Sequence, residues 1–161
     1  MVKKIFVSCS VFCFCLILFM ATAFAKEINC PGGITADIPN SYQVDEEDED
    51  SIFFVSEEDM SLLVIGFEKL EEGENLDTAK EELLKELCEE KDISIESEKT
   101  ENIGGRDVYL LTGKMAIDDI NMKTYFCVFQ YRDKIIFSFF AGKIEDMNNE
   151  KVFRNIIQSI H

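Results

Sequence analysis

The residues with the most chemistry to offer in this chain are its carboxylates, which stand in short runs. Six consecutive acids fill positions 45–50, and shorter runs lie at 57–59 and 118–119. Carboxylate oxygens suit calcium, which takes about six to eight oxygen ligands. A run of neighbouring acids lacks the alternating spacing by which one loop wraps an ion. The candidates for a weak divalent-cation site are Asp48, Asp50, Asp118 and Asp119, and a solvated acidic loop is the favoured alternative.

Catalytic patterns are scarce. The single histidine is His161, the last residue printed, and nucleophilic catalysis needs an imidazole held firmly against its nucleophile. A hydrolase built on paired carboxylates needs two carboxyls about 5–9.5 Å apart, one of them buried enough to raise its pKa. The acids instead cluster in expected turns and on helix surfaces. We therefore expect no enzyme, no catalytic residue and no cofactor, with a carboxylate-dependent hydrolase as the third-ranked reading.

The first 25 residues have the pattern of a secretory signal peptide. Lys3 and Lys4 precede an apolar run at 5–20, and Ala23 and Ala25 supply the small residues of an Ala-x-Ala cleavage site. We expect cleavage after Ala25, a secreted or extracytoplasmic product, and a single domain at 26–161. An uncleaved membrane anchor is the alternative, and the signal type favours a bacterium.

Charge restricts the partners. The chain carries −16, and loss of Lys3 and Lys4 with the signal peptide would take it to −18. So acidic a domain repels nucleic acid and anionic lipid, which makes both poor partners. Basic peptides, cationic polymers or divalent cations fit better, although high solubility alone would also explain the charge. We expect a monomer whose partner is an unknown protein or envelope component, with no membrane insertion after cleavage.

Three cysteines remain beyond the signal peptide. Cys30, Cys88 and Cys127 cannot all pair within one chain, and their spacing matches no zinc pattern. At most one disulfide can form, with Cys30 as its candidate member. Cys88 and Cys127 fall among apolar residues, as free buried thiols do.

The apolar pattern sets the expected elements. Three apolar runs separated by short polar breaks predict an antiparallel meander of three strands. In the central run, at 122–131, both the odd-numbered and the even-numbered positions carry apolar residues, so both faces of that strand are apolar. A sheet covered on both sides explains this, because a half-exposed sheet would alternate with polar residues. The expected elements are a strand at 34–38, a hairpin at 52–55 and 61–67, a helix at 78–90 capped by Asp77, a strand that starts at 93–97 and runs toward Asn102, the meander at 108–115, 122–131 and 135–141, and a helix at 148–160.

This order of elements resembles the PsbP-like sandwich, a family that includes PsbP, Mog-like and DcrB-like proteins. The likeness rests on the opening strand to Pro39, Asn75-Leu76-Asp77 before the first helix, Ile103-Gly104-Gly105-Arg106 before a long strand, the hairpin through Tyr131, and the closing helix at 153–160. It implies an α+β fold, an antiparallel sheet of about six or seven strands between helical layers (an α/β/α sandwich). It also implies a non-catalytic accessory or binding role. No binding residue is carried over.

The remaining candidate for a site is the aromatic set in the meander. Phe126, Phe129, Phe137, Phe139 and Phe140 could pack beneath the two helices or line a ligand groove, and core packing is the favoured reading. The function expected from the sequence is therefore a secreted, non-catalytic binding or accessory domain of the cell envelope. A weak calcium-binding protein is the main alternative.

Overall fold

The computed structural model describes residues 25–70, 75–91, 93–117 and 119–161; for residues 86–91 it describes the backbone only. Its elements follow the chain as β1 (Ala25–Cys30), the short 3-10 turn η1 (Pro31–Gly33), β2 (Ile34–Pro39), β3 (Gln43–Glu47), β4 (Ser51–Ser56), β5 (Ser61–Lys69), α2 (Leu76–Lys91), β6 (Ser94–Ile103), β7 (Arg106–Ile117), β8 (Ile120–Tyr131), β9 (Lys134–Lys143) and α3 (Asn149–Ser159).

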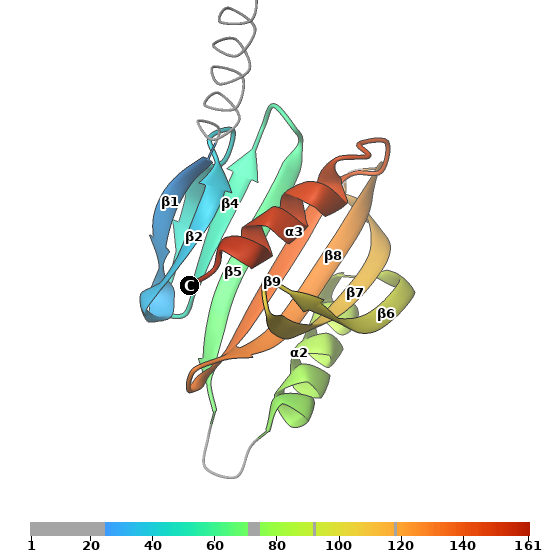
Figure 1. The fold of residues 1–161 in the computed structure, drawn as a ribbon. Coiled ribbons are helices and arrows are strands. Elements are labelled where there is room, and N and C mark those ends of the chain that lie inside the picture. The colour runs from blue at the N-terminus through green and yellow to red at the C-terminus, as the bar shows by residue number, and fades with distance from the viewer. Residues whose placement is uncertain (1–24, 71–74, 92, 118) are drawn as a thin grey trace, which may run out of the picture.

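The central layer is a seven-stranded antiparallel sheet in the order β3-β4-β5-β9-β8-β7-β6. β1 and β2 form a separate two-stranded ribbon. Figure 1 shows α3 and the ribbon lying across one face of the sheet, with α2 on the other side. The α+β class, the strand number and the helical layers predicted from the sequence are all confirmed by this arrangement.

The first core fills the space between the sheet, the β1–β2 ribbon and α3. Phe153 of α3 stacks on Tyr125 of β8 with ring centroids 5.7 Å apart, and Phe140 of β9 lies 6.0 Å from both rings. Their neighbours in this core include Ile34, Ile38, Phe129 and Ile157, each no more than 2% exposed. The apolar residues of α3 recur at helical spacing because they line the one side of the helix that packs into this core.

The second core lies under α2. Ala79 of α2 is fully buried, and Leu76, Leu83 and Leu84 pack around a cluster that includes Phe126, Val128 and Phe139. Two cores on opposite faces explain why neighbouring residues of β8 are both apolar. Phe126, Phe129, Phe139 and Phe140 are therefore core residues, as favoured, and Phe137 is half-buried.

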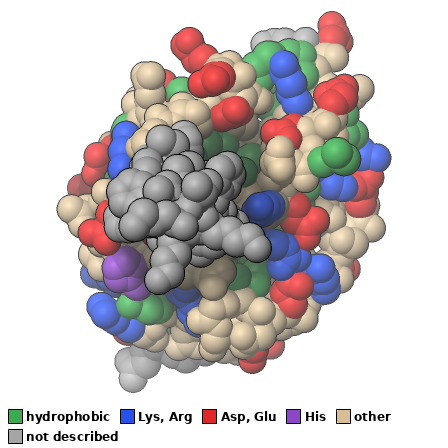
Figure 2. Space-filling view, turned by 45° about the horizontal axis from the view of Figure 1, so that its top comes forward, with side chains coloured by type: hydrophobic (Ala, Val, Ile, Leu, Met, Phe, Trp, Pro, Cys, Tyr) green, Lys and Arg blue, Asp and Glu red, His purple; other side chains and the backbone are tan. Residues whose placement is uncertain are grey.

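The carboxyl end of α3 is fixed to the rest of the fold by residues that carried the family resemblance. Ser159 Oγ accepts a hydrogen bond from the backbone N–H of Asp37 at 2.8 Å and donates to the Ile156 carbonyl at 2.7 Å. His161 exchanges two backbone hydrogen bonds with Thr35 of β2, at 2.8 and 3.0 Å. The backbone of His161 is thus held in place, although its side chain is exposed (purple in Figure 2).

Several local predictions need correction. The cap of α2 is Asn75 rather than Asp77, because Asn75 Oδ1 accepts hydrogen bonds from the N–H groups of Asp77 and Thr78. The strand predicted from position 93 toward Asn102 is present as β6, which spans Ser94–Ile103. The first half of the acidic run at 45–50 belongs to the edge strand β3, and β1 was not expected at all.

The buried cysteines and the amino-terminal segment bear on two further predictions. Cys30 and Cys127 are both buried free thiols, so Cys30 forms no disulfide, while the Cys88 side chain lies outside the described residues. The signal-peptide prediction also lies outside them, apart from Ala25 at the start of β1. Among the described residues, no helix is long and apolar enough to cross a membrane.

Candidate ligand-binding site

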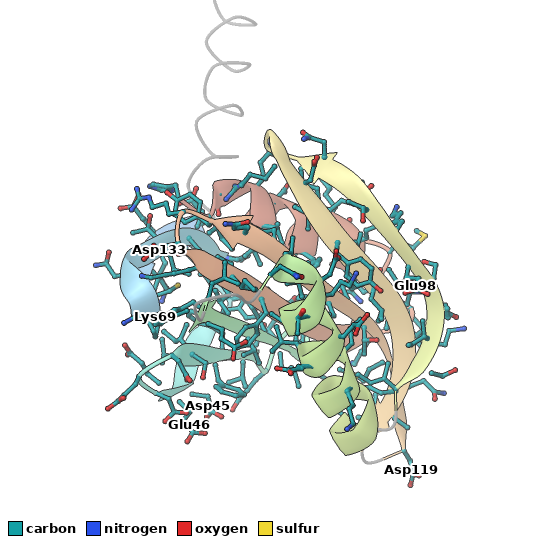
Figure 3. The ribbon with its side chains drawn as sticks, turned by 90° about the horizontal axis from the view of Figure 1, so that it is seen from below. Asp45, Glu46, Lys69, Glu98, Asp119 and Asp133 are labelled. Carbon is teal, nitrogen blue, oxygen red and sulfur yellow. The ribbon has the colours of Figure 1, made fainter. Side chains whose placement is uncertain are left out.

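The structure separates the acids that were candidates for a divalent-cation site. Asp48 and Asp50 lie in the exposed turn before β4, whereas Asp119 lies in the turn before β8, at the opposite end of the sheet. Figure 3 shows the neighbouring Asp45 and Glu46 on one side of the molecule and Asp119 on the other. Asp118 lies outside the described residues. Nowhere in the described chain do three His, Cys, Asp or Glu side chains gather as metal ligands.

A pocket of about 620 Å³ lies instead at the amino end of α3. Its walls come from the loop after β2, the turn between β4 and β5, the end of β9 and the first turns of α3. The lining residues are Pro39, Ser41, Tyr42, Asp59, Ser61, Phe140, Asp146, Asn148, Asn149, Lys151, Val152 and Asn155. Cavities of roughly 300–1,000 Å³ with a few convergent polar groups are the usual form of small-ligand sites.

The floor of the pocket carries a buried pair of hydroxyl groups. Tyr42 Oη and Ser61 Oγ lie 2.6 Å apart, and the two residues are 2% and 7% exposed. Two hydroxyls bring two protons and their mutual bond uses one, so the pair keeps one donor for a third partner. The pKa of Tyr42 is raised to about 12, chiefly by burial; the Ser61 hydrogen bond acts to lower it, and the carboxylates of Asp59 and Asp146 act to raise it. The phenol is therefore neutral at physiological pH.

Two carboxylates stand at the rim. Asp59 Oδ2 accepts a hydrogen bond from Ser56 Oγ at 2.8 Å, and Asp146 Oδ1 accepts one from the backbone N–H of Asn148 at 2.9 Å. Asp59 is exposed and Asp146 half-buried. One oxygen of each carboxylate thus holds its own loop, and the second oxygen can accept a further hydrogen bond.

The first turn of α3 supplies amide groups and a positive charge. Asn149 is 4% exposed and its Nδ2 donates to the carbonyl of Lys143 at 2.7 Å. Gly142 makes room for this amide, since a Cβ there would lie 2.7 Å from Asn149 Oδ1. Lys151 and the positive end of the helix dipole balance part of the charge of the two carboxylates.

This arrangement suits binding better than chemistry. Carboxylate oxygens, three asparagine amides and the hydroxyl pair offer both donors and acceptors, while Phe140, Val152 and Pro39 add apolar surface. Charges of both signs, from Asp59, Asp146 and Lys151, line the walls beside these neutral groups.

Sequence reasoning did not find this site. Its residues come from loops, strand ends and α3, far apart in the chain, and none of them taken alone indicates a binding site. The available signal was the polar Asn148-Asn149 pair at the start of an amphipathic helix, together with Asp59 in an acidic run considered only for a cation site or a solvated turn.

Comparison with solved structures gives the fold. Cyanobacterial PsbP (CyanoP) from Synechocystis sp. PCC 6803 matches with a TM-score of 0.59 and 15% identity, over 86% of this chain and 92% of that one. The fold is PsbP-like. LpqN of Mycobacterium tuberculosis, described as involved in cell envelope biogenesis, matches with a TM-score of 0.58 and 13% identity, over 84% of this chain and 90% of that one.

A third likeness is to a protein of Bacteroides thetaiotaomicron VPI-5482, with a TM-score of 0.63 and 16% identity over 86% of this chain. This chain spans only 48% of that protein's length. Comparison with protein-family models and with curated proteins gave no match. At these identities the likenesses show the fold alone.

Proposed function

We propose that this protein is a non-catalytic binding domain that acts outside the cytoplasm and holds a neutral, hydroxyl-rich ligand in the pocket at the amino end of α3. The chemistry of that ligand is the chemistry of a sugar unit. The observation that carries the proposal is the buried Tyr42–Ser61 pair, which keeps one hydroxyl donor at the floor of a pocket rimmed by two carboxylates and three amides.

The extracytoplasmic setting is supported by the basic start, apolar run and Ala-x-Ala sequence of the first 25 residues. LpqN, which shares the fold, is described as involved in cell envelope biogenesis, and an envelope polysaccharide would present sugar units of the proposed kind. Closer grouping with Mog-like or DcrB-like proteins is part of the proposal and rests on the order of elements alone.

The absence of catalysis is also a proposal. A carboxylate pair that works as acid and base needs one member in an apolar setting that raises its pKa, whereas Asp59 is exposed and Asp146 only half-buried. The Tyr42 hydroxyl keeps its proton to about pH 12 and so is no base. These features favour binding over a carboxylate-dependent hydrolase.

Weak calcium binding in the same pocket is the second candidate. Asp59 and Asp146 could supply carboxylate oxygens, and Ser61 and Asn148 neutral ones. Calcium is ranked lower because one oxygen of each carboxylate is already bonded within its own loop.

Thermal unfolding with a matched set of probes tests the proposal. N-acetylglucosamine and glucose are the neutral sugars, glucosamine and gluconate are charged relatives, and calcium chloride tests the second candidate. A ligand that binds only the native state stabilises it by about 2.7 kcal/mol at one hundred times its Kd. We expect the neutral sugars to raise the melting temperature most. No shift with any sugar would contradict the proposal, and a shift with calcium alone would favour the second candidate.

Two α3 variants separate the pocket from the rest of the surface. Asn155→Ala removes a pocket amide, whereas Gln158→Ala removes a similarly exposed amide from the same helix outside the pocket. We expect the sugar-induced shift to fall in the first variant and to persist in the second.

A further inference from the structure

Strands β4 and β5 are apolar on both faces, and within the described residues the face toward α2 is only partly covered. On the face toward the β1–β2 ribbon, Ile52, Phe54, Leu63 and Ile65 are at most 1% exposed. Side chains alternate between the two faces along a strand, so the residues next to these four in sequence point to the face that carries α2. Phe53, Val55, Leu62, Val64 and, on β9, Phe137 form what we call the apolar strip. Leu62, Val64 and Phe137 pack partly against the core under α2, whereas Phe53 is exposed. An uncovered antiparallel face normally carries polar residues, so the strip is unusual.

The exposed fractions of four side chains that pair across neighbouring strands show how far the cover provided by α2 extends. Glu46, Phe53, Val64 and Phe139 stand side by side on β3, β4, β5 and β9. Phe139 is 7% exposed, Val64 is half-buried, Phe53 is 37% exposed and Glu46 is exposed. α2 contacts β8, and in Figure 3 it leaves the strands near Asp45 and Glu46 to one side. The cover is therefore lost progressively toward the β3 edge.

Acidic residues border the strip on three sides. Glu46 flanks Phe53 at the β3 edge. The turn before β4 holds Asp48, Glu49 and Asp50, and the turn after it holds Glu57 and Glu58, all of them exposed. Lys69, at the end of β5, shares the parity of Leu63 and Ile65 and belongs to the opposite face. The acidic residues at 46–50 and 57–58 thus lie around an apolar surface.

We propose that the apolar strip and its acidic border are the docking surface for a basic, amphipathic segment of a partner protein. Apolar side chains of the segment would cover Phe53 and its neighbours, while lysines or arginines would meet Glu46, Asp50 and Glu58. Charge complementarity decides the occupant. A second copy would bring two acidic borders together, and an anionic lipid surface would be repelled by the same charges.

The test uses a fluorescent amphipathic peptide of leucine and lysine and a scrambled peptide of identical composition that cannot segregate its apolar residues. Fluorescence anisotropy measures the affinity of the full protein for each peptide at about 0.15 M salt, where charges farther apart than about 8 Å are largely screened. We expect the amphipathic peptide to bind at least about tenfold more tightly than the scrambled one. Equal binding, or no binding of either peptide, would overturn the proposal.

Matched variants locate the binding. Phe53→Ser should weaken the amphipathic peptide at least about fivefold, while Ile95→Ser, which removes a similarly exposed apolar residue from β6, should leave the affinity unchanged. Glu46→Gln should weaken binding, and Asp119→Asn on the opposite side of the molecule should not. Equal effects of Phe53→Ser and Ile95→Ser would overturn the proposal. So would a dimer in sedimentation that Phe53→Ser dissociates, because a second copy would then occupy the strip. Unchanged circular dichroism confirms that each variant folds.

Discussion

The guanidinium of Arg106 donates a 2.7 Å hydrogen bond to the carbonyl oxygen of Ile160, which ties the start of β7 to the end of α3. Further bonds reach the carbonyls of Ile157 at 3.2 Å and Gln158 at 3.1 Å. The last carbonyls of a helix have no partner within it, so Arg106 supplies the missing cap from another strand. Its guanidinium also lies 5.0 Å from the ring centroid of Phe129.

Arg106→Ala should lower the free energy of unfolding by about 2–3 kcal/mol, since charged hydrogen bonds to partly buried carbonyls are lost. Arg106→Lys keeps the charge but cannot bond several carbonyls at once, so it should fall between the alanine variant and the native protein. Urea denaturation measures both. A lysine variant as unstable as the alanine variant would show that the charge contributes little.

Gly66 on β5 is required by the ring of Phe137. A Cβ at Gly66 would lie 2.2 Å from Phe137 Cζ, which is far inside contact distance. Gly66→Ala should therefore cost about 1–3 kcal/mol of stability by overpacking. In a Phe137→Ala background the same change should cost much less. Additive costs in this double-mutant cycle would contradict the contact.

Stability should fall at alkaline pH because two thiols are buried. Burial, with a further contribution from Glu47, raises the pKa of Cys30 to about 11, and burial raises the pKa of Cys127 as well. Each folded pKa is raised, so this stability is fully present below the unfolded pKa of about 8.5 and is lost as the pH rises toward the folded value. Cys127→Ala should flatten the decline in unfolding free energy between pH 8 and pH 10. Identical slopes for both proteins would contradict this account.

Removing either hydroxyl of the Tyr42–Ser61 pair should lower the free energy of unfolding, because the remaining buried hydroxyl loses its hydrogen-bond partner. Tyr42→Phe leaves Ser61 without its partner, and Ser61→Ala does the same to Tyr42. Each change should cost about 1–3 kcal/mol, while the double variant should cost less than the sum of the two. Chemical denaturation of the three variants gives the coupling. A sum that is fully additive would mean that the hydroxyls do not depend on each other.

The parts of this fold that could be predicted are those encoded locally. The meander at 108–141 was recognisable because long apolar runs are separated by short polar breaks, one of which is the two-residue turn Arg132-Asp133 between β8 and β9. Arg106 and Ser159 lie in two of the segments on which the family resemblance rests, and both form hydrogen bonds that hold the end of α3 in place. The resemblance therefore captured residues that maintain the fold rather than residues that bind a ligand.

The parts that could not be predicted depend on long-range contacts. β1 pairs only with β2, and its sequence AKEINC has no clear alternation. The pocket combines Tyr42 with Asn149, which lie more than a hundred positions apart and meet only after the sheet forms. The partly covered face of β4 and β5 was invisible as well, because its apolar residues read as core until the position of α2 was known.

An NMR titration with N-acetylglucosamine tests the central claim most directly, because backbone amide shifts report the location of binding as well as its strength. If the pocket at the amino end of α3 is the ligand site, saturable shifts should centre on Tyr42, Ser61, Asn148 and Asn149, and Tyr42→Phe should weaken them. Shifts spread over the acidic turns, or no shifts at tens of millimolar sugar, would contradict the account.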